Sequence, residues 1–140
     1  MIKVSDLIFI TFSLLGFFLI CCSFILSALN RKRYDEICIL YKEKHGSLPE
    51  AITLFKDSDK NMLNILYFNY GYAVKRQFIM MPILSNKNSI HMPDVDKEFI
   101  RGLPKHLIRP FLIEHYLAII GAILIVVGLA LMKIIHHINL

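Results

Sequence analysis

The chain has 140 residues, of which 56% are apolar, and it carries a formal net charge of +5. This length leaves room for one domain, and the high apolar share favours a membrane protein over a soluble one. The positive charge does not indicate a nucleic-acid partner, because fourteen of the sixteen Lys and Arg residues fall between two long apolar runs.

The first apolar run extends from Leu7 to Leu29 and contains no Asp, Glu, Lys, Arg or His. As a helix rising about 1.5 Å per residue it reaches roughly 35 Å, enough for a hydrocarbon core of about 30 Å. A cleaved signal peptide is disfavoured, because the apolar core is too long and no A-x-A-like site precedes Asn30. We therefore predict a short tail over residues 1–6 and a first transmembrane helix over residues 7–29.

The second apolar run lies near the end of the sequence, from Tyr116 to Met132. It predicts a second transmembrane helix over residues 113–135, followed by a tail over residues 136–140. The fold class expected is therefore an all-α integral membrane protein. Two antiparallel transmembrane helices flank a helical insert over residues 30–112.

The basic residues near the ends of the two spans predict the orientation of the protein. Nine of them lie on the insert side, against only Lys3 and Lys133 on the outer tails. For a multi-pass protein in a bacterial inner membrane, the positive-inside rule then predicts a cytoplasmic insert and both termini outside. The residues that carry this topology signal most directly are Arg31, Lys32, Arg33, Arg101, Lys105 and Arg109.

Small residues recur at helical spacing in both spans, and we predict that they form the helix-packing faces. Close approach of two helices in a membrane favours such residues. A homodimer would use the same faces as a hairpin within one chain, and the sequence leaves both open. The predicted packing residues are Gly16 and Ser23 in the first span, and Ala118, Gly121, Ala122 and Gly128 in the second.

In the insert, we expect the first helix to continue to about His45, with Gly46 at its C-cap. The segment from Lys60 to about Gln77 has the pattern of an amphipathic helix, with aromatic and basic residues typical of a membrane surface. Its predicted contacts with anionic lipid are Tyr67, Tyr70, Tyr72, Lys75 and Arg76. Burial of the same face against Tyr34 to Tyr41 is the rival interpretation. An RNA-binding surface is a weaker one, since no RNP-like pattern accompanies it.

The rest of the insert contains fewer periodic segments. Residues 78–93 lack helical periodicity and are predicted to form the most mobile loop. Asp94 is the expected N-cap of a helix over residues 95–101, with Asp96 in its first turn. Pro110 lies where the helix entering the second span would start afresh or kink.

No catalytic motif is found in the sequence, and we predict that the protein is not an enzyme and holds no cofactor or metal. Glu114 and His115 lie at the mouth of the second span, where both are expected to reach water. The adjacent His136 and His137 lack a third ligand nearby. No small-molecule substrate is identified. The centre of neither span contains an acid or base, which argues against a transporter.

Four stretches of the sequence resemble the universal stress protein B family of small two-span proteins of the bacterial inner membrane. They are Asn69–Arg76, Glu98–Arg101, Arg109–Leu112 and Ala130–Met132, mainly in the C-terminal half. The resemblance implies a role in stress tolerance and no catalytic residues.

The sequence thus favours a non-enzymatic membrane protein that acts through protein or lipid contacts in envelope or stationary-phase stress tolerance. The expected partners are the lipid bilayer, including anionic lipid, and a second copy or another membrane protein. Nucleic acid is not expected. Two alternatives stay open, a pore-forming or holin-like membrane protein and an accessory subunit of a membrane complex.

Overall fold

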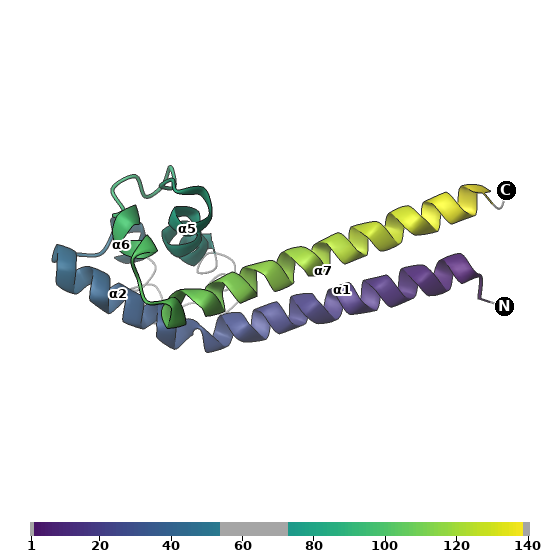
Figure 1. Cartoon of the computed structure of the whole chain (residues 1–140), viewed down its shortest axis with the longest axis horizontal. Coiled ribbons are helices and arrows are strands. Elements are labelled where there is room, and N and C mark those ends of the chain that lie inside the picture. Colours follow the sequence, from purple (N-terminus) through teal and green to yellow (C-terminus); the bar gives the residue numbers. More distant parts are fainter. Residues whose placement is uncertain (1, 54–72, 139–140) are drawn as a thin grey trace. The chain divides into compact units, whose positions relative to one another are not determined.

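The computed structural model describes residues 2–53 and 73–138 of the chain, and the regular elements in these ranges are helices (Figure 1). The expected all-α class is therefore confirmed for the described part. The chain divides into two compact units. Met1–Asn30 and Arg109–Leu140 form the first, and Arg31–Ile108 forms the second.

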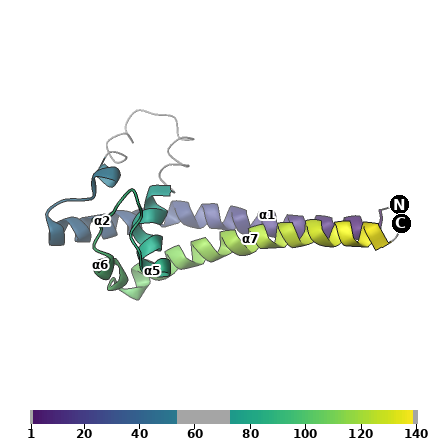
Figure 2. The same cartoon turned by 90° about the horizontal axis from the view of Figure 1, so that it is seen from above.

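The first unit consists of two long apolar helices. Helix α1 spans Val4–Leu29, and helix α7 spans Lys105–Ile138, of which the part from Arg109 onward belongs to this unit. Both are long and apolar enough to cross a membrane. They lie side by side in the ribbon views (Figure 1, Figure 2). Helix α7 continues through Pro110 without a new start.

In the second unit, helix α2 spans Arg31–His45 and is separated from α1 by a turn at Asn30. It ends where the sequence predicted. Gly46 adopts φ +79°, and its N–H donates to the carbonyl oxygen of Lys42 at 2.7 Å. A left-handed glycine in this position closes the last turn of a helix. The turn at Asn30 was not expected from the sequence.

The segment predicted as a loop over residues 78–93 is helical in its first part, which corrects that prediction. A π-helix, η1, spans Arg76–Met80 and leads directly into helix α5, Met81–Ser85. In a regular α-helix the ring of Pro82 would collide with the carbonyl group four residues earlier, and a wider turn relieves this conflict. Asn86, with φ 50°, then ends α5.

The connection from Asn86 to Asp96 is held by side chains that bond to the backbone and to the preceding helix. The amide Nδ2 of Asn88 donates to the carbonyl oxygens of Pro93 at 2.6 Å and Val95 at 2.9 Å. The hydroxyl of Ser89 donates to Gln77 Oε1 at 3.0 Å and accepts from His91 N–H at 3.2 Å. These bonds replace the ladder that a helix or strand would provide.

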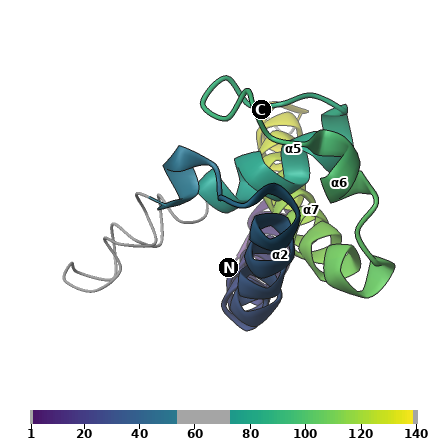
Figure 3. The ribbon, with the colours of Figure 1, turned by 90° about the vertical axis from the view of Figure 1, so that its left-hand side faces the viewer.

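Helix α6 spans Lys97–Arg101 and packs beside α5 (Figure 3). Two of its basic side chains cap the C-terminal end of α5. Lys97 Nζ donates to the carbonyl oxygen of Asn86 at 3.4 Å, and Arg101 Nη1 donates to that of Pro82 at 3.2 Å. Cations are favoured there, because the last carbonyls of a helix lack partners within the helix.

The core of the second unit gathers aromatic and aliphatic side chains from α2, η1, α6 and the first residues of α7. Its fully buried members include Ile37, Cys38, Phe78, Ile79, Ile100 and Leu107. The ring of Phe78 contacts those of Tyr34 and Tyr41 edge-on, at centroid distances of 6.4 and 5.3 Å. Such pairs stabilise beyond the area that they bury.

Candidate functional site

The first candidate site is the contact between α1 and α7 in the first unit, which centres on two glycines. A Cβ atom added to Gly16 would lie 2.5 Å from the carbonyl oxygen of Gly121, and one added to Gly121 would lie 2.6 Å from that of Gly16. The two backbones therefore touch directly, which no larger residue permits. Close backbone approach of this kind is a recurrent way of joining helices inside a membrane.

The predicted packing residues divide into those at this contact and those away from it. Gly16, Ser23, Gly121 and Gly128 are buried. A Cβ atom on Gly128 would lie 2.8 Å from Cβ of Phe12. Ala118 is half-buried, and Ala122 is exposed, so Ala122 takes no part in the contact between α1 and α7. Ala122 directly follows Gly121 in the helix, so the two residues lie on different faces of α7.

A group of buried polar side chains continues the same contact. Ser23 Oγ donates to the carbonyl oxygen of Glu114 at 2.8 Å. Asn30 Nδ2 donates to Glu114 Oε2 at 2.9 Å and to the carbonyl oxygen of Pro110 at 3.1 Å. Polar side chains that bond between helices add to the stability of membrane helix pairs, typically by about 0.6 kcal/mol each.

The burial of this group corrects a prediction from the sequence. Glu114 and His115 were expected to reach water, but they are only 3% and 7% exposed. Sequence reasoning also missed Asn30, which is fully buried. The sequence offered one sign of this burial, since Asn30 is a polar residue at the end of an apolar run. Its partner Glu114 lies 84 positions away, so no local pattern could identify the pair.

The second candidate site lies in the second unit, where one carboxylate joins α2 to α6. Asp96 Oδ1 accepts from Phe99 N–H at 3.0 Å and so caps α6. Its Oδ2 lies 3.3 Å from Lys44 Nζ and 3.2 Å from His45 Nε2. The backbone N–H of Asp96 donates to Tyr41 Oη at 3.1 Å. Asp96 is thus the N-cap, whereas the sequence had favoured Asp94.

These bonds determine the electrostatics of Asp96. Its pKa is lowered, mainly by the hydrogen bond from Phe99 N–H and further by Lys44 and His45, while burial opposes the shift. Each of these partners stabilises the ionised carboxylate over the neutral acid. Asp96 therefore serves as a charged link between the two helices at neutral pH.

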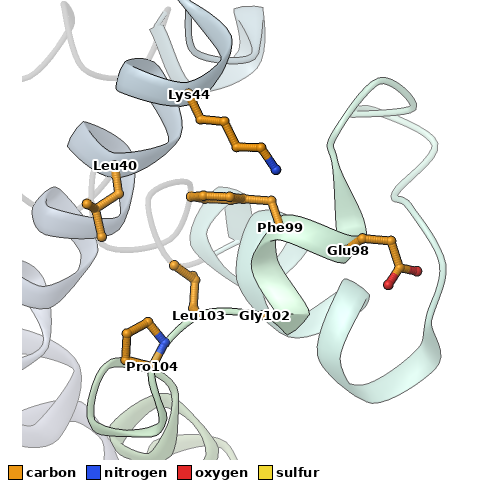
Figure 4. A pocket seen from close by; sticks show the side chains of 7 residues that line it. All are labelled: Leu40, Lys44, Glu98, Phe99, Gly102, Leu103 and Pro104. Carbon is orange, nitrogen blue, oxygen red and sulfur yellow. The ribbon is translucent and has the colours of Figure 1, made fainter.

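A shallow groove of about 520 Å³ lies between α2 and the α6 region of the same unit (Figure 4). Lys44 lies above the ring of Phe99, with Nζ 5.0 Å from the ring centroid. Figure 4 shows Leu40 on the α2 side, level with the ring of Phe99, and Leu103 and Pro104 below them, while the carboxylate of Glu98 points away from the groove. The groove is mostly apolar, with one cation at its edge.

The predicted membrane-surface residues are described only in part. Tyr67, Tyr70 and Tyr72 lie outside the described residues. Lys75 is half-buried and Arg76 is exposed. Val74 and Phe78 beside them are buried, and Phe78 contacts Tyr34 and Tyr41. For residues 73–80 this favours core packing, and the membrane contact of the preceding segment stays a prediction.

The predicted topology residues lie at several places along the chain. Arg101 bonds to the end of α5, as described above. Arg33 is half-buried, and the others, Arg31, Lys32, Lys105 and Arg109, are exposed. Among the described residues, no three His, Cys, Asp or Glu side chains are placed to hold a metal ion.

Comparison with known proteins assigns the chain to no family. No protein-family model, curated protein or solved structure matches it. The resemblance to the universal stress protein B family therefore stays a prediction.

Proposed function

We propose that the chain is a non-enzymatic protein of the bacterial inner membrane that acts through protein or lipid contacts. Its helices α1 and α7 cross the bilayer as an antiparallel hairpin, and residues 30–112 form a cytoplasmic insert. Both termini lie outside the cytoplasm. The resemblance to the universal stress protein B family adds a role in envelope or stationary-phase stress tolerance.

The observation that carries this proposal is the apolar surface of α1 and α7. Only 11% of the most apolar 18-residue window of either helix is buried within the protein. The exposed side chains include Leu14, Phe17, Phe18, Ile25, Ile123 and Val126, each more than half exposed. An apolar surface of this extent is stable among lipid chains and would drive aggregation in water.

The contacts within the first unit support the hairpin. Phe12 meets Gly128, Gly16 meets Gly121, and Ser23 meets Glu114. Positions rise along one helix as they fall along the other, as expected for two spans that cross the bilayer in opposite directions. The buried hydrogen bonds of Asn30 also suit this setting, because polar groups near hydrocarbon must find partners inside the protein.

The excess of basic residues around the insert supports the proposed orientation. It is tested with a reporter that is active only outside the cytoplasm. Fused after Leu140 the reporter should be active, and placed between Ser85 and Ser89 it should be silent. The opposite pattern would contradict the orientation. Resistance of the protein to alkaline extraction from membranes tests the insertion itself.

The absence of a pore is part of this proposal. Glu114 takes part in the contact between α1 and α7 through Asn30, so this carboxylate is used in joining the helices. Purified protein in planar bilayers should show no ion conductance above that of protein-free bilayers. Sustained channel currents would instead favour a pore-forming protein.

A further inference from the structure

An exposed isoleucine stands at the tip of a tight turn in the second unit. The N–H of Met92 donates to the carbonyl oxygen of Ser89 at 3.0 Å, so Ser89–Met92 form a β-turn with Ile90 and His91 at its corner. Ile90 is 93% exposed, more than any other large apolar side chain among the described residues. Turn corners ordinarily hold polar residues or glycine.

The turn is held in place from its base. Ser89 and Met92 on either side of the corner are buried, at 7% and 3% exposure. Ser89 Oγ bonds to Gln77 Oε1 and to the N–H of His91. Asn88 Nδ2 donates to the carbonyl oxygens of Pro93 and Val95 and so holds the segment that follows the turn. Little conformational entropy is then lost when the corner binds something, which favours binding.

The charges around the corner indicate what would bind. The segment Asn86–Pro93 contains no carboxylate, and it carries Lys87 and His91, both exposed. An apolar side chain near the Lys87 cation, in a segment without carboxylates, matches the surface of an anionic leaflet, where hydrocarbon lies beneath negative headgroups.

From this arrangement we propose that the Ser89–Met92 turn is a lipid-binding site that inserts Ile90 into an anionic membrane surface. The inference rests on the proposed membrane insertion, which keeps the second unit close to a bilayer. The turn then adds a second attachment to that surface, beyond the two spans. Lys87 lies against the headgroups in the bound state.

The chain contains no tryptophan, so the variant Ile90→Trp carries a single fluorescent reporter at the corner. The full-length variant is reconstituted in vesicles of phosphatidylglycerol and phosphatidylcholine, with bromine on the acyl chains. We expect blue-shifted emission and strong quenching by the bromine atoms. Glu43→Trp, at an exposed position of α2, is the matched control and should be quenched far less.

Two comparisons make the result decisive. In vesicles of phosphatidylcholine alone, or after Lys87→Gln in anionic vesicles, quenching of Trp at position 90 should fall several-fold. Quenching by bromine no stronger than that of the control, together with full quenching by iodide in the water, would overturn the inference. A protein would then be the more suitable partner for the turn. Strong quenching that ignores lipid charge would overturn the role of the anionic headgroups.

Alkaline extraction of the same vesicles separates failure of this inference from failure of the proposed function. Protein that stays in the membrane while Trp at position 90 remains in water contradicts only the lipid-binding turn. Protein released by the extraction contradicts the membrane hairpin. In that case quenching on addition to preformed anionic vesicles still reports on the turn.

Discussion

Gly16 and Gly121 bring the backbones of α1 and α7 into direct contact, because the carbonyl oxygen of each glycine lies only 2.5–2.6 Å from the position that a Cβ atom on the other would take. Because the obstruction is backbone on both sides, no side-chain rotation can relieve it. The pair therefore sets the distance between the two helices, and the effect of enlarging it can be predicted.

Gly16→Ala or Gly121→Ala should lower the free energy of unfolding by about 1–3 kcal/mol, because the helices must move apart and lose packing along their length. Thermal unfolding of the full chain in detergent, followed by circular dichroism, measures this loss. Ala122→Leu is the control, since position 122 is exposed and should accept the larger side chain without cost. Equal effects at positions 121 and 122 would contradict the assigned contact.

Phe78 should be among the most sensitive positions of the second unit. Phe78→Ala removes a fully buried ring that contacts Tyr34 and Tyr41, and such a change typically costs about 3–5 kcal/mol. Phe17→Ala is the chemically matched control, because Phe17 is 63% exposed and loses no internal packing. Limited proteolysis of the two variants in lipid compares them, and faster cleavage only in Phe78→Ala is expected.

The N-cap of α6 can be tested by comparing two neighbouring aspartates. Asp96→Ala removes the bond to Phe99 N–H and the pairs with Lys44 and His45, so it should destabilise the second unit by about 0.5–2 kcal/mol. Asp94→Ala should change stability little, since Asp94 is exposed. A larger loss of stability in Asp94→Ala than in Asp96→Ala would instead favour Asp94 as the N-cap, as the sequence suggested.

Asp96 should also make stability depend on pH in the acidic range. Its pKa in the folded chain is lowered from the ordinary value of 3.8, so the unfolded chain takes up the proton first as the pH falls. The stabilisation is therefore complete above the ordinary pKa and is lost as the pH falls through it toward the lower folded value.

Thermal unfolding between about pH 6 and about pH 3, compared with Asp96→Asn, isolates this contribution. Asparagine keeps the capping bond but cannot ionise. The difference in stability between the two proteins should shrink as the solution becomes acidic. A difference that stays constant over this range would show that the charge of Asp96 contributes nothing.

Several features of the fold followed from local sequence. The two long apolar helices were predictable, because the runs Leu7–Leu29 and Tyr116–Met132 contain no charged residue, and this is a property of each run itself. The end of α2 was predictable as well, since Gly46 is the residue that most readily adopts the left-handed conformation closing a helix. Four of the buried small residues in the first unit, Gly16, Ser23, Gly121 and Gly128, were identified from spacing.

Other features depended on residues far apart in the chain. Helical structure over residues 78–85 was missed. Most side chains of this segment are buried or half-buried, so the sequence shows no helical periodicity, and Pro82 requires a widened turn that no local rule predicts. The choice between Asp94 and Asp96 as N-cap depended on Tyr41, Lys44 and His45, which lie on another helix.

The sequence by itself therefore determined which segments are apolar enough to enter a membrane and where several helices end, since these properties arise from neighbouring residues. Tertiary structure decided which side of each helix is buried. Gly121 and Ala122 are both small, yet only Gly121 meets a facing backbone. Glu114 is withdrawn from water because Asn30, 84 positions away, supplies its hydrogen bond. Packing of this kind depends on distances in space, which the order of residues does not contain.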